Sequence, residues 1–367
     1  MVCGPLSSHA SFSWTDIMNK FLHKQRIQPL RIRKGLTISQ LVDLYNASGS
    51  FQGGRLGEAA RLYRKMIQED TVICMTISGA MIPAGMGGIV SELIRNGFVD
   101  MIISTGANLY HDMHFALDLP VHQGDFNVDD RELFHEGIER IYDIFITEDL
   151  LKDTDLFIQD ALGDFNTAKP VSTSQIHYHL GQKIKSSTPF PERSLLATAA
   201  DYEVPVYTSS FGDSSIGMNV AFLQMKNIDI VVDPNLDIWE TSAIVFNSQK
   251  NGVVIIGGGS PKNFYLQTQP FISQIANFDH KGHDFDIQIS VDAPHWGGLS
   301  GATPSEAVSW GKINPDEIKN SVVVYSDATI ALPVLAGYVL AEEDARETKQ
   351  LLKNVSDSVK LFQEQIK

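Results

Sequence analysis

The fold is decided by three consecutive stretches: TVICMTIS at residues 71–78, IVSELIRNGF at 89–98 and VDMIIS at 99–104. The two outer stretches are short and apolar, which is typical of buried strands. The stretch between them has apolar residues at helical spacing. Strand, helix and strand in such close succession form a βαβ unit, whose two strands run parallel. The sequence therefore predicts an α/β protein built on a parallel sheet.

The same alternation continues toward the C-terminus. Helices are predicted over residues 57–70, 134–146 and 194–203, and strands over 204–210, 228–234, 251–259, 285–291 and 321–329. We expect a doubly wound, mostly parallel sheet in a single domain over residues 51–367. Residues 1–50 are predicted to be a helical extension, with Thr37 as a helix N-cap. The tail from Glu342 onward is predicted to be a charged amphipathic helix.

Composition and charge exclude several classes of protein. The chain has 367 residues, of which 43% are hydrophobic and 20% charged, as in ordinary globular proteins. Its formal net charge of −15 argues against binding to nucleic acid, whose phosphates require Lys and Arg, and favours a cationic ligand. The two cysteines, Cys3 and Cys74, form no CxxC motif, and no apolar run reaches the length of a membrane span. We expect a cytoplasmic protein without a membrane or nucleic-acid partner.

Small and acidic residues follow four of the predicted strands. The segments are IISTGAN (102–108), YTSSFGDSS (207–215), IIGGGSPK (255–262) and VYSDAT (324–329). Ligands of doubly wound proteins bind at the carboxyl ends of the strands, and small residues there let backbone N–H groups approach phosphates. The chain lacks a GxGxxG fingerprint after its first strand. The triple glycine fits a phosphate-binding loop and equally a tight turn.

The segment SGATPSEAVSWGKI at residues 300–313 places Glu306, Trp310 and Lys312 close together. A lysine beside an aromatic ring can be desolvated, which favours the neutral amine needed for a Schiff base. The indole face of Trp310 can also hold an ammonium group by cation–π attraction. The same short pattern is compatible with a surface turn.

The run EAVSWGKI (306–313) resembles the signature around the active-site lysine of the deoxyhypusine synthase family. Four further stretches resemble that family's cofactor segments in the same order: GFVDMIISTGAN (97–108), FGDSS (211–215), VVIIGGGSPK (253–262) and VYSDAT (324–329). The resemblance covers about residues 35–340 and implies a Rossmann-like fold of the deoxyhypusine synthase type.

The resemblance also implies a reaction. In this family NAD oxidises a polyamine at a carbon next to nitrogen, and an enzyme lysine captures the resulting imine with loss of an amine. The aminoalkyl group then passes to an acceptor amine, a small molecule or a protein lysine, and bound NADH reduces the new imine. By position, Lys312 would be the catalytic lysine and Trp310 would pack on the amine substrate. The residues expected to line NAD are Ser104, Thr105, Gly106, Asp213, Gly257, Gly258, Asp327, Ala328 and Thr329. The family implies a homotetramer.

The sequence departs from the family at positions that bind the polyamine. Met218 and Leu299 stand where the family has acids, and Ala80 stands where it has a cofactor-side asparagine. Because an ammonium without its carboxylate binds weakly, we expect an altered substrate pocket with a changed donor or acceptor. A homospermidine-type amine or a guanidino amine such as agmatine is expected. The residues that we place in this pocket beside Trp310 are His111, which replaces an acid, Asn263, which replaces a histidine, and His295 and Trp296.

Two alternative functions stay open. Potential metal ligands form two tight groups, His111, Asp112 and His114 with His122 nearby, and His177 with His179; Asp292 and His295 add a further pair. A metal-dependent hydrolase of a guanidino or amide substrate is therefore one alternative. The chain has no HExxH motif, and we predict no metal site. The other alternative is a non-catalytic NAD-binding homologue. Retention of Lys312 beside Trp310 argues against it.

Overall fold

The computed structural model describes residues 25–165, 167 and 169–366. Residues 1–24 of the predicted N-terminal extension therefore lie outside the described residues. Within the described ranges, no helix combines the length and the apolar character that crossing a membrane requires.

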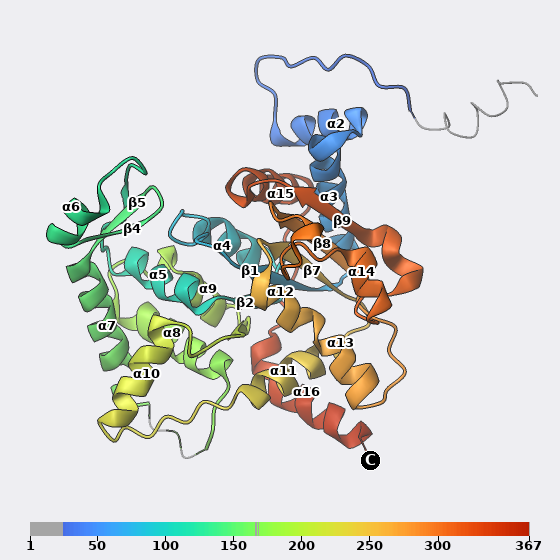
Figure 1. Cartoon of the computed structure of the whole chain (residues 1–367). Coiled ribbons are helices and arrows are strands. Elements are labelled where there is room, and N and C mark those ends of the chain that lie inside the picture. The colour runs from blue at the N-terminus through green and yellow to red at the C-terminus, as the bar shows by residue number, and fades with distance from the viewer. Residues whose placement is uncertain (1–24, 166, 168, 367) are drawn as a thin grey trace, which may run out of the picture.

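Six strands form the central sheet in the order β6-β2-β1-β7-β8-β9, and every pairing is parallel (Figure 1). The bounds in sheet order are β6 (Val206–Thr208), β2 (Met101–Ser104), β1 (Val72–Ile77), β7 (Asn251–Ile256), β8 (Phe285–Ser290) and β9 (Ser321–Tyr325). Each lies in a stretch that the sequence predicted as a strand. The predicted fold class, an α/β protein with a mostly parallel sheet, is confirmed.

Helices cover both faces of this sheet. Those up to the middle of the chain are α2 (Ile38–Ser48), α3 (Phe51–Gln68), α4 (Gly87–Arg95), α5 (Gly106–Ala116), α6 (Asp130–His135), α7 (Glu148–Gly163), α8 (Thr173–Ser187) and α9 (Leu195–Asp201). The later ones are α10 (Ser215–Met225), α11 (Pro234–Asn247), α12 (Gly259–Leu266), α13 (Thr268–Pro270), α14 (Pro304–Ser309), α15 (Ala328–Glu342) and α16 (Leu351–Gln365). Figure 1 shows α3 and α15 on one side of the sheet and α11 and α16 on the other.

Two hydrophobic cores result from the alternation of side chains along the strands. In β1, Ile73 and Met75 point into the core that contains residues of α3 and α15. Cys74, between them, is fully buried in the second core, with residues of α11 and α16. Both faces of β1 are therefore covered, which explains why its sequence is a continuous apolar run rather than an alternating one.

The N-terminal helix α2 begins at the predicted cap. The hydroxyl of Thr37 accepts a hydrogen bond from the backbone N–H of Gln40, and the Gln40 side chain accepts one from the N–H of Thr37, which is a capping box. The helix packs against α3 and α15. The proposed boundary of the extension at residue 50 stays a prediction.

The helix predicted over residues 134–146 is wrong. The stretch holds the end of α6 and a hairpin of β4 (Ile138–Ile141) and β5 (Ile144–Thr147), which pairs with β3 (His122–Gln123) in a separate antiparallel sheet. Gly137 at φ +65° and Tyr142 at φ +56° adopt left-handed conformations that interrupt a right-handed helix. The apolar residues in this stretch fit both periodicities, and the backbone reversals decided between them.

The strand predicted over residues 228–234 is also wrong. The segment makes only an isolated bridge between Val171 and Val232, although Ile230 is fully buried. Asp233 ends the segment as the N-cap of α11, with Pro234 in the first turn of that helix. The apolar run supplies core contacts without a neighbouring strand to pair with.

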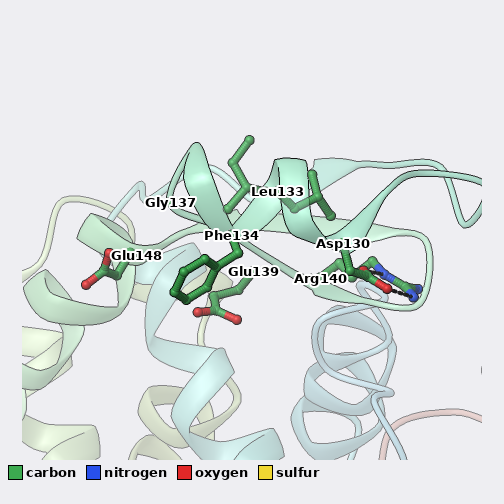
Figure 2. Close-up of a pocket in the computed structure, with 8 residues that line it drawn as sticks. Asp130, Leu133, Phe134, Gly137, Glu139, Arg140 and Glu148 are labelled. Carbon is green, nitrogen blue, oxygen red and sulfur yellow. Dashed lines mark hydrogen bonds and ion pairs between the residues drawn. The ribbon is translucent and has the colours of Figure 1, made fainter.

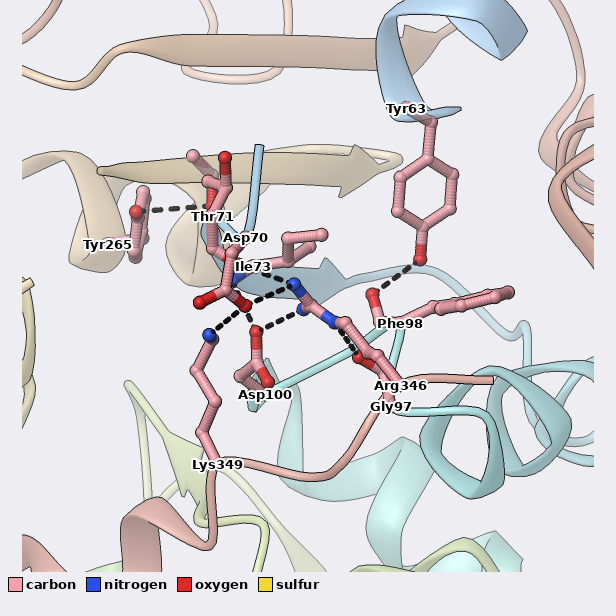
Figure 3. Close-up of polar contacts among 11 residues, drawn as sticks. Tyr63, Asp70, Thr71, Ile73, Gly97, Phe98, Asp100, Tyr265, Arg346 and Lys349 are labelled. Atoms are coloured by element: carbon pink, nitrogen blue, oxygen red, sulfur yellow. Dashed lines mark hydrogen bonds and ion pairs between the residues drawn. The ribbon is translucent and has the colours of Figure 1, made fainter. Parts of the chain in front are cut away.

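The predicted C-terminal helix begins at Leu351 rather than at Glu342, because an ion-pair segment separates α15 from α16. Arg346 donates from Nη2 to Asp100 Oδ2 at 2.7 Å and from Nη1 to the carbonyl of Thr71 at 3.1 Å (Figure 3). Lys349 pairs with Asp70 at 2.5 Å. Because these partners flank the amino ends of β1 and β2, the segment ties the C-terminus to the sheet.

Candidate functional site

The strand order reverses between β1 and β7. From β1 the chain passes to β2 on one side, and from β7 it passes to β8 on the other side. At such a switch point the loops diverge at the carboxyl ends of the strands, and ligands of α/β proteins bind there. Ser78 follows β1 and the triple glycine follows β7, so the predicted triple-glycine loop lies at this place.

The triple glycine is packed tightly against its neighbours. Gly257 and Gly258 have φ values of +85° and +138°, and a Cβ added to Gly258 would lie 2.6 Å from Ser300 Cα. The N–H of Gly258 donates to Ser78 Oγ at 2.9 Å, and that of Gly259 donates to Ser300 Oγ at 3.0 Å. The glycines are required by backbone conformation and close packing, while these two amides are already engaged within the protein.

Three helices begin at this edge of the sheet: α5 after β2, α10 after β6 and α12 after β7. Their loops touch, because a Cβ on Gly106 would lie 2.3 Å from Ser214 Cβ, and the hydroxyls of Ser209 and Ser260 lie 2.7 Å apart. Helix N-termini carry partial positive charge and unpaired N–H groups, which suit a pyrophosphate. The residues present at this edge therefore fit a dinucleotide.

The structure brings some predicted cofactor residues together and leaves others apart. Ser104 is buried and donates to the carbonyl of Ile77 at 3.3 Å, whereas Thr105 is half-buried at the start of α5. Asp213 is exposed in the loop before α10. The segment Asp327, Ala328 and Thr329 follows β9, two strands from β7, and Asp327 Oδ1 accepts from the Thr329 amide at 2.7 Å as the N-cap of α15.

Lys312 lies in a cavity of about 170 Å³ that is also lined by residues of β8. Its lining includes Asn263, Leu266, Leu299, Pro304, Glu306 and Trp310 as well as Lys262, Asp286 and Gln288. Lys312 Nζ donates to Asn263 Oδ1 at 3.1 Å and lies 5.8 Å from the centre of the Trp310 ring. The predicted grouping of Asn263, Trp310 and Lys312 is present in this cavity.

The local sequence explains how Lys312 reaches this place. Helix α14 ends at Trp310, and Gly311 at φ +67° turns the chain. The N–H groups of Gly311 and Lys312 donate to the carbonyls of Val308 and Ala307, which is a Schellman motif. The carbonyl of Lys312 then accepts from His283 N at 2.9 Å, which fixes the lysine next to the start of β8.

The environment of Lys312 favours its neutral form. Burial lowers the pKa of Lys312, and the nearby Glu306 carboxylate acts in the opposite direction. The neutral amine is the form that attacks a carbon electrophile. The indole of Trp310 is 68% exposed, so the cavity opens past this ring.

Sequence reasoning missed the floor of the cavity. Lys262 and Asp286 are 4% and 1% exposed, and Gln288 is also buried. Asp286 and Gln288 are the polar members of the run FDIQIS, at alternate positions of a strand that is buried throughout. Polar residues at that spacing in a buried strand need partners on one face, which is the signal that could have identified them.

Three predicted substrate residues lie outside the lining of this cavity. His111 on α5 has its Nδ1 2.8 Å from His114 Nε2, and His114 Nδ1 lies 2.9 Å from Thr154 Oγ1. His295 and Trp296 are exposed and pack against each other with ring centres 4.6 Å apart. Among the described residues, no three His, Cys, Asp or Glu side chains are grouped as metal ligands. The assignment of these three residues to substrate stays a prediction.

A larger hollow of about 720 Å³ lies on the small antiparallel sheet, on the opposite side of the view from α14 (Figure 1). Figure 2 shows Arg140 paired with Asp130 at one end and the exposed ring of Phe134 between Glu139 and Glu148. The side chains that line it include no lysine, cysteine or histidine. Its charges are those of a solvated surface, so we place the chemistry at the smaller Lys312 cavity.

Comparisons with known proteins identify the family of the chain. The sequence model of the deoxyhypusine synthase family matches residues 40–339. A protein from Nostoc punctiforme named "Deoxyhypusine synthase-like protein" is 45% identical over 336 residues, which cover 89% of this chain and 86% of the relative. A protein from Methanosarcina acetivorans named "Probable deoxyhypusine synthase 2" is 40% identical over 304 residues, 83% of this chain and 86% of the relative.

The fold is also similar to a solved structure. A crystal structure from Entamoeba histolytica that bears a deoxyhypusine synthase name superposes with a TM-score of 0.58 at 17% identity. The alignment covers 88% of this chain and 99% of the other. At this identity the likeness supports the fold alone.

Proposed function

Because this chain belongs to the deoxyhypusine synthase family, a family of transferases, we propose that it transfers an aminoalkyl group from an amine donor to an acceptor amine through an imine on Lys312. The observation that carries the proposal is the lysine itself. Its Nζ is held against Asn263 in a partly enclosed cavity, and burial lowers its pKa. A neutral lysine amine beside an aromatic wall is suited to capture and release an imine carbon.

Each residue has a defined part in this scheme. The nitrogen of Lys312 attacks the imine carbon of the oxidised donor, the amine fragment that carries the original imine nitrogen leaves, and a C=N bond to Lys312 forms. Attack by the acceptor amine then releases Lys312 unchanged. Trp310 holds the cationic chain by cation–π attraction, and Asn263 orients the lysine through the 3.1 Å hydrogen bond.

We propose NAD as the cofactor that takes up the donor's hydride and later returns it. Support comes from the switch point, where the starts of α5, α10 and α12 meet the loops that contain Gly106, Gly257 and Gly258. Asp213 and the Asp327–Thr329 segment are proposed to contact the remainder of the dinucleotide. We further propose a homotetramer, which sedimentation at several protein concentrations would test.

We propose that the substrate pocket differs from that of a true deoxyhypusine synthase. Leu299 lines the Lys312 cavity and Met218 is 62% exposed on α10, so neither of these two positions provides a carboxylate for a polyamine. A homospermidine-type or guanidino amine is the expected partner. Transfer from spermidine to a hypusine-type protein acceptor by the purified protein would contradict this part of the proposal.

The central test is borohydride trapping. The protein is incubated with NAD and a panel of amines, reduced with borohydride, and analysed by intact mass and peptide mapping. One amine should add its aminoalkyl mass to the Lys312 peptide. Lys312→Ala should abolish the adduct, whereas Lys319→Ala, which removes an exposed lysine, should retain it. NAD binding without an adduct from any amine would refute the transfer mechanism and favour a non-catalytic protein or a hydrolase.

A further inference from the structure

A buried carboxyl group without a partner lies at the floor of the Lys312 cavity. Asp286 is the second residue of β8, its exposed fraction is 1%, and it lines the same cavity as Lys312. Within the described part of the chain, Asp286 Oδ1 has no hydrogen-bond partner. Buried carboxyl oxygens are nearly always satisfied, because desolvating them without compensation is costly. An orphan oxygen in a cavity wall therefore indicates a ligand.

The neighbouring Lys262 ammonium lowers the pKa of Asp286 by charge attraction, but it donates no hydrogen bond to this oxygen. Lys262 Nζ donates to Gln288 Oε1 at 3.0 Å, to the carbonyl of Leu299 at 3.1 Å and to the carbonyl of Ala302 at 2.5 Å. An ammonium group has three hydrogens, and these three acceptors use all of them. Lys262 therefore holds the loop over the cavity in place, and Asp286 keeps its acceptor free.

The rest of the cavity suits an aliphatic chain. Its walls include Leu266, Leu299, Pro304 and Ala307, and the indole of Trp310 flanks the opening. Apolar walls above a single buried acid are complementary to methylene groups that end in a positive charge. Asp286 on β8 and Lys312 after α14 would then contact two different ends of one molecule.

We propose that Asp286 binds the cationic end, an ammonium or guanidinium group, of the amine that reacts at Lys312, and thereby selects donors with two nitrogens. The inference rests on the proposed function, because it assigns the second end of the same substrate. It also explains why positions such as Leu299 lack the family's acids, because Asp286 binds the cation at the cavity floor instead. Burial raises the pKa of Asp286 to about 7, and a bound cation restores the charged form.

The test is calorimetric binding in the Lys312→Ala background, where no covalent step interferes. The probes are an unbranched diamine, a guanidino amine of similar length and an alkyl monoamine of the same length, each with and without NAD. Asp286→Asn should weaken binding of the two dications by about 10- to 100-fold, because a charge-assisted hydrogen bond is lost. The ratio of the dissociation constants of the diamine and the guanidino amine identifies the preferred cation. Asp316→Asn, an exposed acid paired with Lys281, is the matched control and should change nothing.

Two results would overturn the inference: equal dication affinity with Asn at position 286, or no binding by any probe. A second measurement does not depend on the variant's folding. With Asp286 intact, the dications must bind at least about 10-fold more tightly than the monoamine. Asp286-dependent binding without a trapped Lys312 adduct would refute the transfer function alone. Undiminished trapping of diamines on Lys312 with Asn at position 286 would refute the Asp286 subsite alone.

Discussion

Replacement of Arg346 by methionine should destabilise the protein in a manner that depends on pH. The Arg346 side chain is 14% exposed and its partner Asp100 is 1% exposed, with Nη2 and Oδ2 2.7 Å apart (Figure 3). Asp100 Oδ2 also accepts from the backbone N–H of Ile73 at 2.9 Å. Methionine keeps the aliphatic bulk and removes the cation, so a buried carboxylate is left without its counter-charge.

The magnitude follows from the pKa of Asp100. Burial raises this pKa from 3.8 to about 6, although the Arg346 guanidinium lowers it. The folded state thus binds the proton more tightly than the unfolded state, and this group reduces stability as pH rises from 3.8 to about 6. Without Arg346 the folded pKa is higher still, so the variant continues to lose about 1.4 kcal/mol per pH unit above the wild-type value.

The expected loss is therefore about 1–2 kcal/mol at about pH 5, from hydrogen bonds to backbone carbonyls, and about 4–5 kcal/mol at about pH 8. Urea unfolding followed by circular dichroism at both pH values measures it. Arg131→Met, which removes an exposed pair with Asp129, should leave the free energy of unfolding nearly unchanged at either pH. An equal loss at the two pH values for Arg346→Met would refute the assignment to Asp100.

Three further predictions concern single groups. Gly311→Ala places a side chain at φ +67° and should lower the free energy of unfolding by about 1 kcal/mol. Mass spectrometry should show a lower yield of the borohydride-trapped adduct on Lys312, and titration should show that NAD binding is retained. Gly258→Ala drives a Cβ to 2.6 Å from Ser300 Cα and should weaken NAD binding at least 10-fold in a fluorescence titration, about 1.4 kcal/mol. Tyr63→Phe removes a buried hydrogen bond to a backbone carbonyl and should lower the free energy of unfolding by about 1–2 kcal/mol in urea.

Local errors in the predicted elements have a common cause. Over residues 134–146 the apolar positions fit both a helix and alternating strands, and the choice depends on left-handed residues such as Tyr142 that no propensity rule assigns. Over residues 228–234 Ile230 is fully buried, Val231 is exposed, and the segment makes a single isolated bridge instead of a strand pairing. Pairing depends on which strands are neighbours in space, which an apolar run does not specify.

The sequence by itself determined the parallel sheet, because strands covered on both faces, such as β1 and β7, must be continuous apolar runs. It also determined the Lys312 segment, since Gly311 and the residues before it specify the helix end that precedes the lysine. Only the tertiary structure decided what surrounds Lys312. Lys262 is satisfied by acceptors 26 to 40 residues away, and Asp286 is left unpaired because those acceptors use every ammonium hydrogen. Such a result depends on distances between loops that are remote in sequence, and no local pattern contains them.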